Sequence, residues 1–170
     1  MPLALYEPDI AQNTGTILRL YACLGIDAHI IEPAGFPVSD RALRRAGMDY
    51  LDHVAVTRHL SWAAFEAWRH GPAAPAGDAK GSPPRLLLLS TRATTSYLDF
   101  AYRADDILLL GRESAGVPAA VHAAADARLT IPMRAGMRSL NVAVAAAMAA
   151  GEMLRQMNVP TGQQTPPRQA

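Results

Sequence analysis

Two short runs of uninterrupted aliphatic residues most constrain how this chain can fold. Residues 86–89 read LLLL and residues 107–110 read ILLL. A strand with one face in water alternates apolar and polar side chains, whereas a strand of a parallel sheet is covered on both faces and is apolar throughout. The two runs therefore predict central strands of a parallel sheet with helices on both of its faces.

The remaining sequence alternates strand-like and helical segments, as an α/β domain does. Strands are expected at 3–6, 28–31, 54–57, 86–90, 107–110 and 129–133. Helices are expected at 13–24 with Asn13 as cap and Gly25 as stop, at 40–46, at 62–68 capped by Ser61, and from about 140 to 157. The fold class predicted is α/β, with a mostly parallel sheet flanked by helices.

The length of 170 residues fits one domain. We expect that domain to span 1–157, with 158–170 as a disordered tail, and the proline-, alanine- and glycine-rich segment 70–84 to be a surface loop. No apolar run reaches the roughly 18 residues of a membrane-spanning helix, and the first residues do not resemble a secretory signal. A cytoplasmic protein that does not enter membranes is predicted.

Cysteine and charge exclude several classes of protein. The single cysteine, Cys23, excludes an internal disulfide framework and is expected to be a small core residue. A net charge of +1 argues against a broadly basic, nucleic-acid-coating surface. Of the 16 basic residues 15 are arginines, which suit bidentate contacts with phosphate, although a bias in genomic base composition also explains this preference. RNA binding would therefore need a local patch or help from a partner, or it would be weak.

Common nucleotide and metal sites are absent from the sequence. There is no G-x-G-x-x-G fingerprint, and GRESAG (111–116) is followed by Val117 and Pro118 where a P-loop needs lysine and a hydroxyl residue. The five histidines have no spacing typical of metal ligands. No metal is expected.

Three segments remain that each follow a predicted strand at its carboxyl end, which is where ligands bind in open α/β sheets. They are QNTGTILR (12–19), LLLGRESAGVP (108–118) and IPMRAGMRSLNVAVAAAMAA (131–150). Taken singly they also suit a helix cap, a glycine/proline turn and a capped final helix. Their joint occurrence in this order favours one composite site.

These segments resemble the three motifs of the SPOUT (SpoU-type) RNA 2′-O-methyltransferases. The family motifs N-x-G-x-x-x-R, G-x-E-x-x-G-L/V-P and I-P-M followed by S-L/M-N correspond to 13–19, 111–118, 131–133 and 139–141. Segments 6–20 and 29–59 are similar to the branch of the family that methylates the tRNA wobble nucleotide, a cytidine or a modified uridine. The resemblance covers most of residues 3–157.

The resemblance implies a C-terminal trefoil knot that binds S-adenosylmethionine, a homodimer, and a substrate in the anticodon loop of tRNA. It implies cofactor contacts by Leu89, Gly111, Ile131, Met133 and Ser139. It implies catalytic roles for Asn13, Arg19, Glu113, Ser139 and Asn141. Arg19 would be either the base or a cation that holds phosphate and stabilises the alkoxide, the second being easier because an arginine normally stays protonated.

Substrate binding is expected to rest on a few arginines shared between two subunits. The candidates are Arg41, Arg44, Arg45, Arg134 and Arg138. The arginines at 41–45 also suit a solvated helix face. Two other functions remain open from the sequence: the same reaction at another tRNA or rRNA position, and an RNA-binding protein on this fold that has lost catalysis.

Overall fold

A computed structural model describes residues 2–38, 55–74 and 82–157. The strands are β1 (Leu3–Tyr6), β2 (Ala28–Ile31), β3 (Val56–His59), β4 (Leu86–Leu89), β5 (Thr95–Ser96), β6 (Ile107–Leu110) and β7 (Ala127–Thr130). The helices are α1 (Ala11–Leu24), α3 (Trp62–Arg69), α4 (Ala119–Ala124) and α5 (Val142–Gln156). No helix within these ranges has the length and apolarity needed to cross a membrane.

All the strands join one parallel sheet in the order β3-β2-β1-β6-β4-β7-β5. The aliphatic runs form β4 and β6, which pair with each other near the middle of the sheet from Leu86 opposite Ile107 to Leu89 opposite Leu110. The predicted α/β class with a parallel sheet is therefore confirmed. β7 lies between β4 and β5, although it follows both of them in the chain.

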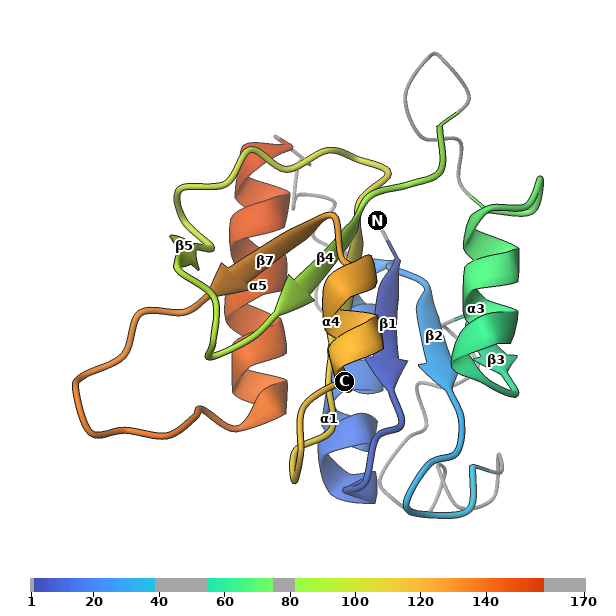
Figure 1. The fold of residues 1–170 in the computed structure, drawn as a ribbon, viewed down its shortest axis with the longest axis horizontal. Coiled ribbons are helices and arrows are strands. Elements are labelled where there is room, and N and C mark those ends of the chain that lie inside the picture. The colour runs from blue at the N-terminus through green and yellow to red at the C-terminus, as the bar shows by residue number, and fades with distance from the viewer. Residues whose placement is uncertain (1, 39–54, 75–81, 158–170) are drawn as a thin grey trace, which may run out of the picture.

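Helices cover both faces of the sheet because successive side chains of each strand point to opposite faces. Leu87, Leu108 and Leu110 face a core completed by α1 and α5. Leu86, Leu88, Ile107 and Leu109 face a second core completed by α3 and α4. Figure 1 shows this layering, with α3 and α5 at opposite ends of the view.

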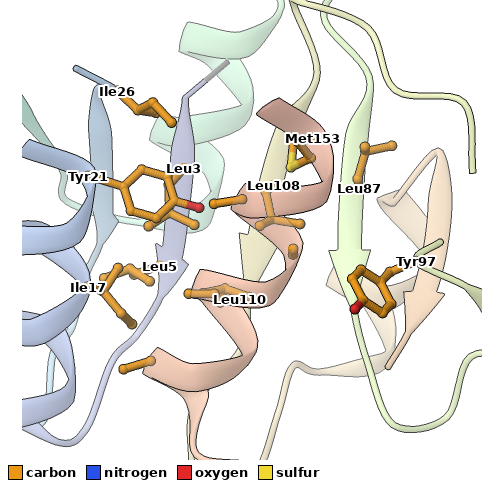
Figure 2. Close-up of a cluster of buried hydrophobic side chains, with 14 of the residues drawn as sticks. Leu3, Leu5, Ile17, Tyr21, Ile26, Leu87, Tyr97, Leu108, Leu110 and Met153 are labelled. Atoms are coloured by element: carbon orange, nitrogen blue, oxygen red, sulfur yellow. The ribbon is translucent and has the colours of Figure 1, made fainter. Parts of the chain in front are cut away.

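The first of these cores packs α1 and α5 against strands whose carboxyl ends form the site described below. Figure 2 shows Ile17 and Tyr21 of α1 directed at Leu3 and Leu5 of β1, with Met153 of α5 near Leu108. The small side chains Ala143, Ala146, Ala149 and Ala150 let α5 lie close to the strands, and all four are buried.

Helix ends test the capping predictions. Ser61 caps α3 by accepting a hydrogen bond from the Ala64 amide at 3.1 Å, and Gly25 ends α1 with φ of 66°. The predicted Asn13 cap is wrong, because α1 begins two residues earlier at Ala11 with Ile10 as its cap. Asn13 therefore lies in the first helical turn, and its side chain is available for tertiary contacts.

Other expectations need correction. The last strand ends at Thr130 instead of Met133, because its ladder with β4 and β5 ends there and Pro132 has no amide hydrogen to extend it. The third strand is shifted by two residues to Val56–His59. Cys23 is exposed instead of buried, since it lies on the outer side of α1. The predicted helix at 40–46 and the tail at 158–170 lie outside the described residues.

Two histidines on neighbouring strands form a buried pair behind the second core. The Nδ1 atom of His29 in β2 lies 2.9 Å from Nε2 of His59 in β3, and the rings of Phe65 and Trp68 pack around them. Burial, and secondarily the charge of His59, lowers the pKa of His29 to about 4. Burial also lowers the pKa of His59. The pair is therefore neutral when the protein is folded near neutral pH.

Candidate active site

A cavity of about 470 Å³ lies at the carboxyl ends of β4, β6 and β7, where the three sequence motifs meet. Its volume is in the range of pockets that enclose small organic ligands. Every residue predicted to contact the cofactor lines it, namely Leu89, Gly111, Ile131, Met133 and Ser139. Among the predicted catalytic residues Asn13, Glu113, Ser139 and Asn141 line it as well.

The turn after β6 leaves no room for a side chain at Gly111. A Cβ atom there would lie 2.8 Å from the carbonyl carbon of Gly116 and 3.0 Å from Cγ1 of Val117. Arg112 and Gly116 close the turn with two backbone hydrogen bonds of 3.1 and 2.9 Å. Gly116 itself has φ of +68°, which favours glycine. The second motif is therefore a compact loop whose backbone forms part of the cavity wall.

A chain of side-chain hydrogen bonds joins the three motifs at the mouth of the cavity. Asn13 of α1 donates from Nδ2 to Oε1 of Glu113 at 3.2 Å. Asn141 donates from Nδ2 to Oδ1 of Asn13 at 3.0 Å. The Oδ1 atom of Asn141 also accepts the amide of Ala143 at 2.8 Å, so the residue caps α5. Each amide is thus oriented by a partner on another element.

Asp9, which the sequence reasoning did not single out, holds Glu113 in place. The Glu113 amide donates to Oδ1 of Asp9 at 3.1 Å, and the Asp9 amide donates to Oε2 of Glu113 at 3.3 Å. Burial and the neighbouring Asp9 carboxyl raise the pKa of Glu113. Interactions with the Glu113 side chain and with Ser114 keep the pKa of Asp9 below its usual range. The only sequence signal for Asp9 was its position between the first strand and the first motif.

Arg112 is a second residue that the sequence reasoning missed, and it places a cation in the cavity wall. Its Nη1 atom lies 3.1 Å from Oε2 of Glu7, and its Nε atom lies 3.9 Å from Oδ2 of Asp9. Glu7 has φ of 42°, a left-handed conformation that a side chain rarely adopts. The motif leaves this position variable, so its pattern carried no signal for Arg112.

The predicted arginines are not gathered in the cavity. Arg19 is exposed on α1 and does not line the cavity. Arg134 and Arg138 are exposed on the loop between β7 and α5, also outside the lining. The predicted RNA-binding residues at 41, 44 and 45 lie outside the described residues.

The lining of the cavity suits an organic cofactor. Its lining combines apolar side chains such as Leu89, Leu110 and Ile131 with backbone at the ends of three parallel strands, where ladder pairing stops. The close approach at Gly111 keeps this wall free of a side chain. Within residues 2–38, 55–74 and 82–157, no group of three potential metal-binding side chains is found.

Known proteins share this sequence and fold. The model of the SpoU rRNA Methylase family matches residues 1–151. A tRNA (cytidine(34)-2′-O)-methyltransferase of Beijerinckia indica subsp. indica is 65% identical over 155 residues, which are 91% of each chain.

Two solved structures have a fold similar to that of this chain. A structure described as giving insights into the 2-OH methylation of C/U34 on tRNA has a TM-score of 0.80 and 41% identity, covering 92% of this chain and 95% of that one. The SpoU methyltransferase AviRb from Streptomyces viridochromogenes, solved with its cofactor AdoMet, has a TM-score of 0.81 and 26% identity. That match covers 94% of this chain and 58% of the other.

Proposed function

Because the chain belongs to the SpoU rRNA Methylase family, we propose that it methylates the ribose 2′-hydroxyl of the tRNA wobble nucleotide, position 34, with S-adenosylmethionine as donor. The proposal rests on one observation: two hydrogen bonds join the side chains of Asn13, Glu113 and Asn141 at the mouth of the cavity. The named relatives support the choice of nucleotide, since one is 65% identical over nearly its whole length.

Five residues would hold the cofactor: Leu89, Gly111, Ile131, Met133 and Ser139. S-adenosylmethionine, when bound, supplies a methyl group on a positively charged sulfur. The apolar walls would exclude water, and the strand-end backbone beside Gly111 and Ile131 would form hydrogen bonds to the adenine. The AdoMet-bound relative supports this assignment of the cavity.

The polar chain at the mouth would position the attacking hydroxyl. Glu113 fixes the Asn13 amide, and Asn13 in turn accepts from Asn141. A rigid set of dipoles of this kind costs no reorganisation during reaction and can stabilise a developing alkoxide. Ser139, exposed at the same mouth, would add a hydroxyl that orients the ribose.

Arg19 would complete the site from a second copy of the chain. It is exposed and lies outside the cavity lining of its own chain, so a role at the reacting hydroxyl needs another protomer to bring it there. An apolar stripe supports a homodimer: Leu140, Val144 and Met148 follow one another at i, i+4 and i+8, and Val144 is 50% exposed. Val144→Arg should give a monomer in sedimentation velocity, whereas a dimer of unchanged strength would contradict this interface.

Residues 1–157 would form one domain with a trefoil knot, located in the cytoplasm where tRNA is modified. The order β4-β7-β5 is consistent with the knot, because β7 enters the sheet between two strands that precede it in the chain. An unknotted backbone trace in a crystal structure with S-adenosylhomocysteine would contradict it.

RNA would be held by Arg134 and Arg138 on the exposed loop, together with Arg41, Arg44 and Arg45. Charge reversal at Arg44 and Arg45 should weaken tRNA binding and flatten its dependence on salt, while cofactor affinity stays constant. Unchanged tRNA affinity would contradict this placement and leave those arginines as a solvated helix face.

The deciding experiment incubates the protein with isotopically labelled S-adenosylmethionine and total tRNA, followed by nuclease digestion and mass spectrometry. The expected product carries a 2′-O-methyl group on nucleotide 34, and Glu113→Gln serves as the inactive control. A methyl group found at another tRNA or rRNA position would show that the enzyme acts on a different nucleotide from the one proposed. Absence of S-adenosylhomocysteine binding at millimolar ligand in calorimetry would favour an RNA-binding protein without catalysis.

A further inference from the structure

A second cavity, of about 560 Å³, adjoins the one described above and has a different chemical character. The two share Arg92, Val117 and His122, and the second cavity adds Ala119, Ala123 and Arg128. Among the described residues that line it, none is acidic. Two arginines and a histidine therefore surround a floor of small apolar side chains.

The described partners of Arg128 are two backbone carbonyl groups and a histidine ring, with no carboxylate among them. Its Nε atom donates to the carbonyl oxygen of His122 at 2.8 Å and to Nδ1 of His122 at 3.1 Å, and its Nη2 atom donates to the carbonyl oxygen of Ala123 at 3.2 Å. By contrast, Arg85 and Arg155 each pair with a carboxylate. Arg128 is thus held rigidly by the end of α4, with no anion paired to it among the described residues.

The same contacts define the state of the His122 ring. Because Nδ1 accepts from Arg128, the proton of the neutral ring lies on Nε2. That Nε2 atom is buried and has no hydrogen-bond partner in the described part of the chain. A buried donor without an acceptor is costly, and it is satisfied when a ligand supplies the acceptor.

We propose that Arg92, His122 and Arg128 form a binding site for a backbone phosphate of the substrate RNA. Phosphate oxygens can accept from the His122 Nε2–H and pair with both guanidinium groups, which match phosphate geometry. Since the cavity shares Arg92, Val117 and His122 with the proposed cofactor site, the bound phosphate lies beside the cofactor. The inference rests on the proposed function for the identity of the RNA.

Binding of a labelled anticodon stem-loop RNA, measured by fluorescence anisotropy over a range of salt, tests the site independently of methyl transfer. Arg92→Ala should weaken binding about tenfold, the usual effect of one charge-assisted hydrogen bond, and reduce the slope of log Kd against log salt by about one. The matched control is Arg103→Ala. Arg103 is exposed and lies just before the amino end of β6, whereas the cavity lies near the carboxyl ends of the strands. This variant should bind as the unmodified protein does.

Two histidine variants separate the ligand contact from the contact with Arg128. His122→Asn keeps an acceptor near Nδ1 but removes the Nε2 donor, so RNA affinity should fall without a change in the salt slope. His122→Gln places an amide donor near the Nε2 position and should recover most of that loss. Thermal unfolding of both variants checks that α4 is retained.

Two outcomes would overturn the inference. Unchanged RNA affinity in Arg92→Ala and His122→Asn overturns it. Weaker binding of S-adenosylhomocysteine in calorimetry, with RNA affinity intact, also overturns it and assigns the cavity to the cofactor's carboxylate. The tRNA methylation assay on the unmodified protein is scored separately, so that failure of the proposed function is distinguished from failure of this phosphate site.

Discussion

Asn141 donates a hydrogen bond to Asn13 across 3.0 Å, although 128 positions separate them in the chain. The contact joins the start of α5 to the first turn of α1. Because Asn13 also donates to Glu113, it links all three sequence motifs through side chains alone. Asn13, Glu113 and Asn141 therefore form one hydrogen-bonded unit, and substitutions that remove one of its bonds at a time should have different effects.

Asn141 has two separable roles. Asn141→Ala should lose the α5 cap, costing about 1 kcal/mol in the free energy of unfolding, and should also lose methyl transfer. Asn141→Asp keeps the capping oxygen but cannot donate to Asn13, so it should retain stability and still lose activity. Thermal unfolding and initial rates on tRNA measure the two effects. An Asp variant with normal turnover would show that the bond to Asn13 is dispensable.

Gly111 and Gly116 should respond in opposite ways to alanine. At Gly111 a Cβ would meet the Gly116 carbonyl carbon at 2.8 Å, so the loop must shift and the cofactor affinity should fall at least tenfold, or about 1.4 kcal/mol. At Gly116 nothing lies within 4 Å, and only the positive φ is penalised, by about 1 kcal/mol of stability. Calorimetry with S-adenosylhomocysteine compares them. Equal affinities would contradict the tight-wall interpretation.

Glu113→Gln should abolish activity, and its free energy of unfolding should rise relative to that of the unmodified protein as pH increases. The pKa of Glu113 is raised in the folded state, so the folded protein binds more protons than the unfolded chain above the ordinary value of 4.5. The free energy of unfolding therefore falls as pH increases through the raised pKa. Urea unfolding from pH 4 to 7 should show the stability of the variant rising relative to the unmodified protein. A constant difference would contradict a raised pKa.

The His29–His59 pair predicts that the free energy of unfolding falls as pH is lowered, which is opposite to the effect of Glu113. His29 has a folded pKa of about 4 against an ordinary 6.5, so its stabilising effect is complete above 6.5 and is lost as pH falls toward 4. The loss amounts to about 3 kcal/mol. His29→Asn, whose amide can still contact His59, should lose most of this dependence in urea unfolding across that range. A variant as acid-sensitive as the unmodified protein would exclude His29 as the cause.

Mixed dimers test whether Arg19 acts on the partner's cavity. Arg19→Ala and Glu113→Gln should each be inactive alone, because each removes part of the proposed site. If Arg19 serves the other protomer, a dimer of one chain of each kind contains one intact site, and methyl transfer returns on mixing. If Arg19 serves its own cavity, both sites stay defective and the mixture remains inactive. Co-purification through two different affinity tags isolates the mixed dimer for this assay.

The elements that local pattern defines were predicted well. The leucine runs of β4 and β6 could be identified because burial on both faces leaves no polar position. β5 and α4 escaped notice because one has two residues and the other six, so neither has a period to detect. The end of β7 was misplaced because pairing with β4 and β5, not hydrophobicity, sets its limits.

The sequence predicted most residues of the site but not the hydrogen bonds between them. Motif resemblance pointed to Asn13, Glu113 and Asn141, yet the expected cap at Asn13 was wrong because α1 begins earlier. The roles of Asp9 and His122 depend on contacts over long sequence separations or on the geometry of a buried ring. No spacing rule in one sequence identifies such contacts.

The position of β7 also has a consequence for synthesis on the ribosome. β4 pairs directly with β6, but β5 is joined to the sheet by β7. A nascent chain that has not yet reached Ala127 lacks that link, and it also lacks the Ile131, Met133 and Asn141 parts of the cavity wall. Because segments are made from the amino end, the pocket is completed only after Ala145, the last residue of its lining, has been made. We therefore expect a nascent chain that ends before Ala145 not to bind the methyl donor.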